Sequence, residues 1–199
     1  MLDMINEDLN RLGLFCSPAK VCVGRAVCSC FLRFANLLYP LGLGVHPHQN
    51  LSVKVEIDTN PPGGGRVVEY FHNGPIMFTV NHHDLPSLFA GKLHAVLFRG
   101  FVKGRDYFDL MLFLSKKVPF NARLLSNPTL QTHPDTMLES IDGIVQRLKM
   151  RLNEVDEKTI AGDLEPFLLE PEDLRFITPG NLVDALERNM ADGVFLREW

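Results

Sequence analysis

Six charged side chains are concentrated in the middle of the chain, between residues 92 and 109. They are Lys92, Arg99, Lys103, Arg105, Asp106 and Asp109. Lysine binds a phosphate group as a point charge and arginine binds it as a planar fork, while a carboxylate can orient these cations, hold a metal ion or act as a base. Folding alone does not require charge here, so the pattern predicts a phosphate-binding cluster at the edge of an apolar core.

Two of these residues also have an ordinary structural explanation. Lys92 lies on the border of an apolar helix face, where a lysine commonly extends its charged end into solvent. Asp106 stands at the expected start of a helix, where a carboxylate can cap the first turn. The explanations differ in geometry, because phosphate binding requires Lys92 and Asp106 to converge and the structural alternative leaves them apart.

Two apolar helices must position the cluster. The first follows Asp84 as its N-cap, and Arg99 is expected to project from the same side of it as Lys92. The second is expected over residues 106–117 and has almost no polar face, which is typical of a buried helix. The apolar face of the first helix is expected to consist of Leu85, Leu88, Phe89, Leu93, Val96 and Leu97.

A third element lies upstream. Residues 51–58 alternate apolar and polar positions, which predicts a strand with Glu56 and Asp58 on its polar face. A run of prolines and glycines follows and ends the strand. The strand face is either simply solvated, or Asp58 at its end offers a carboxylate to a metal ion. In the second case Asp58 should converge with Lys92 and Asp106.

Four segments, in this order, resemble the AbiEii/AbiGii nucleotidyltransferase family, toxin components of bacterial toxin–antitoxin and phage-defence systems. They are residues 54–62 (KVEIDTNPP), 85–97 (LPSLFAGKLHAVL), 103–109 (KGRDYFD) and 164–168 (LEPFL). The resemblance implies similarity to the polymerase β-like nucleotidyltransferases, which transfer a nucleotide from a nucleoside triphosphate (NTP) to an acceptor such as tRNA. It also implies Mg²⁺ as cofactor and a cognate antitoxin as partner.

With this resemblance, three residues receive catalytic roles. Asp58 is expected to bind the metal, Lys92 to contact the triphosphate, and Asp106 either to orient Lys92 or to act as a base. Arg99, Lys103 and Arg105 are expected to bind substrate phosphates, and Glu56 and Asp109 to support the site.

One part of the family pattern is missing from the sequence. Such proteins begin with a Gly-Gly or Gly-Ser turn, a helix and an Asp-x-Asp pair that holds two metal ions, and no such region precedes Leu51. Asp58 would match the third acid of that arrangement. We therefore expect a truncated nucleotidyltransferase. The alternative is a non-catalytic remnant or interaction module of a toxin–antitoxin system.

Composition limits the choice of function further. The chain has 199 residues, of which 46% are hydrophobic and 22% charged, and its net charge is −4. This charge argues against nonspecific nucleic-acid binding over the whole surface, so any RNA contact must be local to the basic cluster. The four cysteines lack the spacing of a zinc site. The acidic N-terminus and the absence of a long apolar run predict a cytoplasmic protein with no membrane segment.

The elements together predict an α+β fold with a partial nucleotidyltransferase-like, small, mostly antiparallel sheet, N-terminal helices and a helical C-terminal half. Helices are expected over residues 3–13 and 18–38, and strands over 51–58, 67–72 and 75–80, with a hairpin turn at Asn73-Gly74. The predicted domains are 1–83 and 84–199. The open edge of the sheet is expected to permit self-association.

Two later helices have recognisable start signals. A capping box at residues 136–139 (TMLE) predicts a helix that continues to about residue 153. Thr178-Pro179 predicts another that continues to about residue 190.

Overall fold

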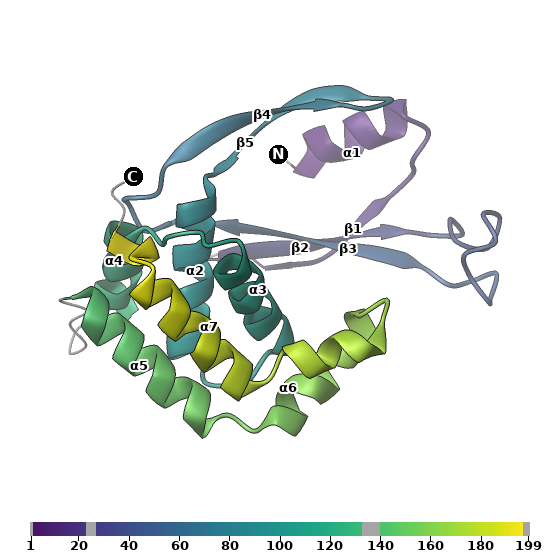
Figure 1. Ribbon diagram of the computed structural model, residues 1–199. Coiled ribbons are helices and arrows are strands. Elements are labelled where there is room, and N and C mark those ends of the chain that lie inside the picture. Colours follow the sequence, from purple (N-terminus) through teal and green to yellow (C-terminus); the bar gives the residue numbers. More distant parts are fainter. Residues whose placement is uncertain (1, 23–26, 133–139, 197–199) are drawn as a thin grey trace. The chain divides into compact units, whose positions relative to one another are not determined.

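The computed structural model describes residues 2–22, 27–132 and 140–196, and the chain divides into two compact units, residues 1–61 and 62–199. Figure 1 follows the chain from its purple N-terminal elements to its yellow C-terminal helix. Small antiparallel sheets, an N-terminal helix and a helical C-terminal half confirm the predicted α+β class. The units separate at the Pro61-Pro62 pair, directly after a strand.

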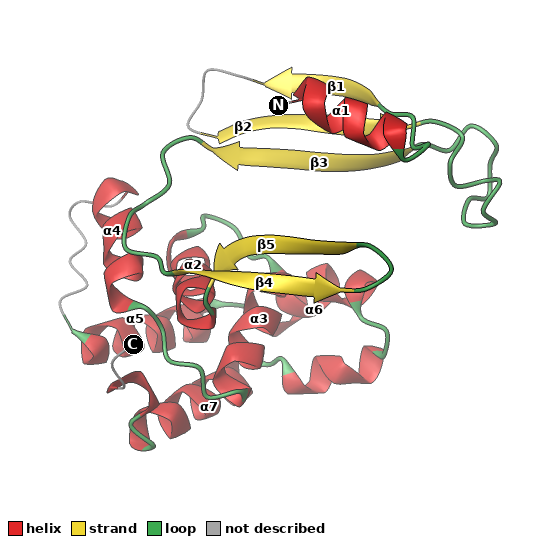
Figure 2. Ribbon diagram, turned by 90° about the horizontal axis from the view of Figure 1, so that it is seen from above, coloured by secondary structure: helices red, strands yellow, loops and turns green. Residues whose placement is uncertain are grey.

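The first unit consists of one helix and a three-stranded antiparallel sheet in the order β1-β2-β3. Its elements are α1 (Leu2–Arg11), β1 (Ser17–Cys22), β2 (Val27–Phe34) and β3 (Leu51–Asp58). β2 pairs with β3 along its whole length, from Val27 opposite Asp58 to Phe34 opposite Leu51. In Figure 2 the three strands lie side by side, with α1 against them.

The prediction of a helix over residues 18–38 is wrong, because this segment contains β1 and β2. Cys30 and Phe34 are four residues apart, which suits one face of a helix and equally suits alternate positions of a strand. Leu32, midway between them, is buried as well. A burial period of two belongs to a strand. The expected helix at residues 3–13 is confirmed as α1.

The second unit begins with a β-hairpin and continues with helices. Its hairpin strands are β4 (Val67–Asn73) and β5 (Met77–His83). Its helices are α2 (Leu85–Phe98), α3 (Gly104–Ser115), α4 (Ala122–Thr132), α5 (Ile141–Glu154), α6 (Glu157–Leu164) and α7 (Pro179–Ala191), with short 3₁₀ turns η1 (Glu165–Phe167), η2 (Pro171–Phe176) and η3 (Val194–Leu196).

The three predicted strands belong to two sheets instead of one. β3 joins the sheet of the first unit, whereas β4 and β5 pair only with each other, from Val67 opposite His83 to Asn73 opposite Met77, among the described residues. The hairpin is also tied to the helices, because the Asp84 N–H donates to the Arg66 carbonyl (3.0 Å) and the Arg66 N–H donates to Ser87 Oγ (3.0 Å). The boundary expected at 83/84 therefore falls inside the second unit.

Helix starts were predicted well where a capping side chain is present. Asp84 accepts the Ser87 N–H at the start of α2, and Thr178 accepts the Asn181 N–H at the start of α7. The predicted capping box at residues 136–139 lies outside the described residues. In the described part, Ser140 caps α5 by accepting the Gly143 N–H.

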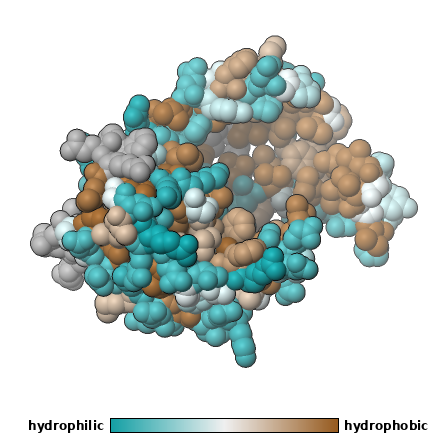
Figure 3. All heavy atoms as spheres, in the orientation of Figure 1, coloured by the Kyte–Doolittle hydropathy of each residue, from teal (hydrophilic) through white to brown (hydrophobic). Residues whose placement is uncertain are grey.

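The helices of the second unit enclose one continuous apolar core. Phe89, Leu93, Leu110, Leu148 and Leu182 are among its fully buried members, contributed by α2, α3, α5 and α7. On the face seen in Figure 3, the outer surface of these helices is mostly hydrophilic. This distribution is the amphipathic pattern of helices around a shared core.

One detail of the predicted α2 face is wrong. Leu85 and Leu88 are exposed, and Ser87 and Ala90 are buried in their place. The buried face of α2 is therefore rotated relative to the prediction. Ser87 is buried because its Oγ accepts hydrogen bonds from the Arg66 N–H and from the Asn121 side chain. The rotation leaves Lys92 and Arg99 on the side of α2 that meets α3.

Candidate functional site

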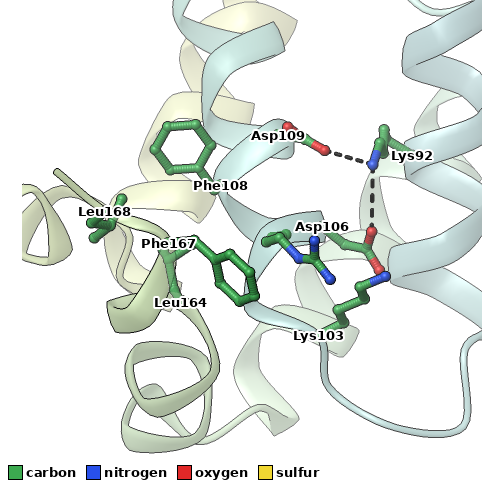
Figure 4. Close-up of a pocket in the computed structure, with 9 residues that line it drawn as sticks. Lys92, Lys103, Asp106, Phe108, Asp109, Leu164, Phe167 and Leu168 are labelled. Atoms are coloured by element: carbon green, nitrogen blue, oxygen red, sulfur yellow. Dashed lines mark ion pairs between the residues drawn. The ribbon is translucent and has the colours of Figure 1, made fainter. Parts of the chain in front are cut away.

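A pocket of about 360 Å³ lies in the second unit, where α3 meets α2 on one side and α6 with η1 on the other. Figure 4 shows its lining, with charged side chains from α2 and α3 facing apolar side chains from the later segment. The lining residues are Lys92, Lys103, Arg105, Asp106, Phe108, Asp109, Leu164, Phe167 and Leu168. Five of the six charged residues of the predicted cluster are among them.

The charged side chains that line the pocket (Lys92, Lys103, Arg105, Asp106 and Asp109) form its charged wall, and Asp106 is at the centre of this wall. Its carboxylate is buried, with Arg99 Nε 3.1 Å from Oδ2 and Lys92 Nζ 3.7 Å from Oδ1. Lys92 Nζ also lies 2.6 Å from Asp109 Oδ2. Lys92 therefore does not simply extend into solvent, and Asp106 does more than occupy the first turn of its helix. The predicted convergence of Lys92 with Asp106 is found, and Asp109 joins it.

The local sequence explains why Asp106 points inward. α3 begins at Gly104, with Lys103 at the N-cap position, so Asp106 is the third helical residue and not the first. A carboxylate in the first turn interacts favourably with the helix dipole. The buried face of α3 includes Asp106, Tyr107, Leu110 and Leu114. The partners Lys92 and Arg99, one on each carboxylate oxygen, compensate the buried charge.

Arg151 on α5 stabilises the end of α2 that carries Arg99, and no sequence pattern predicted this role. Its guanidinium donates to the carbonyls of Val96 (3.4 Å) and Arg99 (3.2 Å), which belong to the C-terminal end of α2. Arginine at a helix C-terminus satisfies carbonyls that have no partner within the helix. Arg151 thereby fixes the backbone from which the Arg99 side chain reaches Asp106. Only its position in the folded molecule reveals this role.

Tyr107 is buried beside Asp106. Burial raises the pKa of the Tyr107 hydroxyl above the ordinary value, and the negative charge of Asp106 raises this pKa further. The positive charge of Arg151 acts in the opposite direction and lowers this pKa. The phenol therefore stays protonated at neutral pH.

Lys103 and Arg105 are the cations of the pocket that have no carboxylate partner in the described part of the chain. Among the described residues, neither makes an ion pair, in contrast to Lys92 and Arg99. The guanidinium of Arg105 lies over the Phe167 ring, 4.3 Å from its centroid. With Lys92, the lining holds three cations against the carboxylates of Asp106 and Asp109. The pocket therefore has a positive balance that suits an anion such as a phosphate group.

The apolar wall comes from residues 164–168, to which the sequence analysis gave no role. Gly104 lets this segment approach, because a Cβ there would lie 2.6 Å from the Ile160 carbonyl oxygen and 3.0 Å from Leu164 Cβ. The Gly104 N–H also donates to Asp163 Oδ2 at 2.7 Å. The signal in the sequence was the LEPFL segment, quoted only as part of the family resemblance.

Asp58 and Glu56 belong to the first unit, so their convergence with Lys92 stays a prediction. Asp58 Oδ1 accepts the Asn60 N–H at 2.9 Å, and Glu56 pairs with Lys54 at 2.6 Å on the exposed polar face of β3. Within the described residues, no group of three or more His, Cys, Asp or Glu side chains is placed to hold a metal ion. Any metal bound at Asp58 would need further oxygen ligands, such as substrate phosphates.

Comparison with known proteins supplies the family. No curated protein and no solved structure matches the chain. Within residues 2–22, 27–132 and 140–196, no helix is both long and apolar enough to cross a lipid bilayer. The family model for the nucleotidyl transferase AbiEii toxin of type IV toxin–antitoxin systems matches residues 32–179, which include every residue that lines the pocket. This chain therefore belongs to the AbiEii nucleotidyl transferase toxin family.

Proposed function

We propose that this protein transfers a nucleotide from a nucleoside triphosphate to an RNA acceptor such as tRNA, with the triphosphate bound at the charged wall of the pocket. The observation that supports this most directly is the pairing pattern of the cations. Lys92 is held in place by Asp106 and Asp109, while Lys103 and Arg105 have no carboxylate partner among the described residues. Such an arrangement orients one cation and leaves two for an incoming anion.

The reaction requires positioning and charge neutralisation more than covalent help from the protein. In this proposal Lys92, Lys103 and Arg105 contact the triphosphate, and Arg99 adds positive charge behind them. Asp106 acts as a positioning residue for Lys92, because each of its oxygens already faces a cation. This arrangement favours orientation over the alternative role as a base. Asp109 releases Lys92 to the phosphate when substrate binds.

Mg²⁺ is the proposed cofactor, with Asp58 as its ligand and Glu56 in support. Both carboxylates are exposed on the same face of β3, and Asp58 keeps an oxygen that does not accept the Asn60 N–H. Mg²⁺ commonly combines one or two protein carboxylates with substrate phosphates, so these residues suit it chemically. The ion would supply charge neutralisation on the triphosphate.

The biological setting follows from the family. A cognate antitoxin is the proposed partner, the cytoplasm the proposed location, and phage defence the proposed role. Self-association through the edges of the β1-β2-β3 sheet is also proposed, because β1 and β3 each have one neighbour in the described sheet. The molecular mass of the native protein alone tests self-association, and its molecular mass in the presence of the antitoxin tests antitoxin binding.

The direct test is incubation of the protein with labelled NTPs, Mg²⁺ and total tRNA. Label in RNA is expected with the wild type, and Lys92→Ala should reduce it about 100-fold or more, as removal of a charge-stabilising group does. Lys117→Ala is the matched control, because Lys117 forms an exposed ion pair with Asp192 outside the pocket. Equal labelling by Lys92→Ala and wild type would overturn the assignment of Lys92.

A second candidate function is a non-catalytic interaction module. The absence of a three-residue metal cluster in the described part of the chain favours this alternative. It predicts that the protein binds its antitoxin and labels no RNA under any condition. Transfer of label by the purified wild type, lost in Asp58→Asn, would exclude it.

A further inference from the structure

The pocket has a second wall of different chemistry. Phe108, Leu164, Phe167 and Leu168 face the charged side chains across the cavity, and the Phe167 ring is turned toward those charges in Figure 4. Phe167 is 57% exposed, although Leu164, three residues earlier at the end of α6, is buried. A cavity that combines an exposed aromatic ring with several cations can bind a ligand that is both flat and anionic.

The ring is held in place by contacts on two sides. Leu164 belongs to the core, and η1 continues directly from α6, so the backbone of Phe167 is anchored by a buried helix. The hydrogen bond from Gly104 to Asp163 fixes the end of this helix against the start of α3. On the other side, the Arg105 guanidinium lies over the ring. A preorganised ring binds a planar ligand with little loss of side-chain entropy.

We propose that Phe167, together with Arg105, stacks the nucleobase of the nucleoside triphosphate, while Lys92 and Lys103 hold its phosphates. This inference rests on the proposed function, since it concerns the substrate of the same site. Bases stack on aromatic rings and on guanidinium planes, and every base offers a π-face. The cavity of about 360 Å³ is at the small end of the usual range for ligand pockets, so one nucleotide suits it better than an oligonucleotide.

Stacking also accounts for the double role of Arg105. Its guanidinium can remain over the aromatic surface and still donate hydrogen bonds at its edge to a phosphate, because its donors lie in the plane of the group. Lysine at this position would provide the charge without the flat surface. The pair thus joins the apolar and charged walls, and it predicts a preference for nucleotides over inorganic polyphosphate.

A similar pair elsewhere in the chain provides a matched control. Arg175 lies 4.7 Å from the Phe176 ring centroid, and Phe176 is 51% exposed, but neither residue lines this pocket. The two residues are neighbours in sequence and form part of η2. Substitution of Phe176 therefore removes an exposed aromatic ring and its cation contact without altering the pocket.

The experiment compares dissociation constants of ATP, GTP, CTP, UTP and inorganic tripolyphosphate for the wild type, Phe167→Ala, Phe167→Tyr and Phe176→Ala, with Mg²⁺ present. Phe167→Ala should weaken binding of all four NTPs about 5- to 100-fold and change tripolyphosphate binding less than about twofold, as expected for loss of a stacked base. Phe167→Tyr should retain NTP binding, and Phe176→Ala should match the wild type. Thermal melting of each variant verifies that it is folded.

The outcomes separate this inference from the proposed function. Equal losses for NTPs and tripolyphosphate in Phe167→Ala, or unchanged NTP affinity, would overturn stacking. If a Lys92→Ala/Lys103→Ala double variant binds tripolyphosphate as tightly as the wild type, the proposed phosphate site fails, and the inference fails with it. Loss of tripolyphosphate binding in that double variant, with normal NTP binding by Phe167→Ala, would leave the function intact and refute stacking alone.

Discussion

The two units differ in how much apolar surface they bury. In the described part of the first unit, the core consists of Cys30, Leu32 and Phe34, covered by half-buried side chains of α1 and its neighbours. In the second unit a continuous core extends from α2 to η3. Buried apolar area is the main source of stability. The larger core of the second unit can therefore offset the cost of burying a charged site. The smaller core of the first unit provides less stability for such a site.

A cavity in the larger core has the largest expected effect. Leu148 is fully buried in α5, and Leu148→Ala should lower the free energy of unfolding by about 2–5 kcal/mol. Leu32→Ala in β2 is the matching change in the first unit. Urea unfolding followed by hydrogen exchange of each unit is the measurement. If Leu32→Ala raises exchange in α2–α7 as strongly as in β1–β3, the units do not unfold separately and the comparison fails.

Loss of a buried charge is expected to have the second-largest effect on stability. Asp106→Asn removes the counter-charge of Arg99 and one of the two carboxylates that face Lys92, and should cost about 2 kcal/mol, since both cations remain partly exposed to solvent. Glu56→Gln breaks the ion pair with Lys54 on β3, which at 2.6 Å is shorter than either ion pair of Asp106 but exposed, and should cost less than about 1 kcal/mol. Urea titrations at low and high salt compare the two variants. Equal costs would show that burial is not the deciding factor.

The close approach of α3 and α6 predicts a smaller loss. Gly104→Ala would place a Cβ against the Ile160 carbonyl, a backbone atom that cannot move easily, and should destabilise the second unit by about 1–2 kcal/mol. A Cβ at Gly91 in α2 would meet no atom of the described residues within 4 Å beyond its own stretch of helix, so Gly91→Ala should stabilise by about 0.5–1 kcal/mol. Opposite signs in thermal melting would confirm the difference between the two glycines. A neutral Gly104→Ala would contradict the packing argument.

The smallest effect concerns Tyr107. Tyr107→Phe removes a buried hydroxyl that interacts electrostatically with Arg151 and should cost about 1 kcal/mol at neutral pH. Because burial raises the pKa of the hydroxyl, the folded protein keeps this proton while the unfolded chain loses it above about pH 10. The stability advantage of the wild type over the variant is therefore complete below pH 10 and should shrink as pH rises further. Tyr39→Phe, at an exposed position, is the control, and a gap that widens above pH 10 would refute the assignment.

The sequence was a good guide to the second unit and a poor guide to the first. α2, α3 and α7 form where helices were predicted, and Asp84 and Thr178 mark the starts of α2 and α7 by their own side chains. In β2 the spacing of Cys30 and Phe34 is common to helix and strand. The pairing of β2 with β3 decides between them, and such long-range pairing is not encoded in local spacing.

The site was predictable where neighbours in sequence are neighbours in space. Lys92, Arg99 and Asp106 lie on consecutive helices, so their spacing already implied a shared location. Arg151 and Phe167 come from later segments. Arg151 has no sequence feature that distinguishes it from an ordinary surface residue, and Phe167 was marked only as part of the LEPFL segment of the family resemblance. The contribution of Asp58 depends on the first unit and stays a prediction.

The hydrogen bond between Gly104 and Asp163 connects residues that are 59 positions apart. The charged wall is local in the chain, so it can form as soon as α2 and α3 pair, whereas the apolar wall must wait until α6 has docked. The complete pocket therefore depends on a contact between segments far apart in the chain, and the charged wall alone does not.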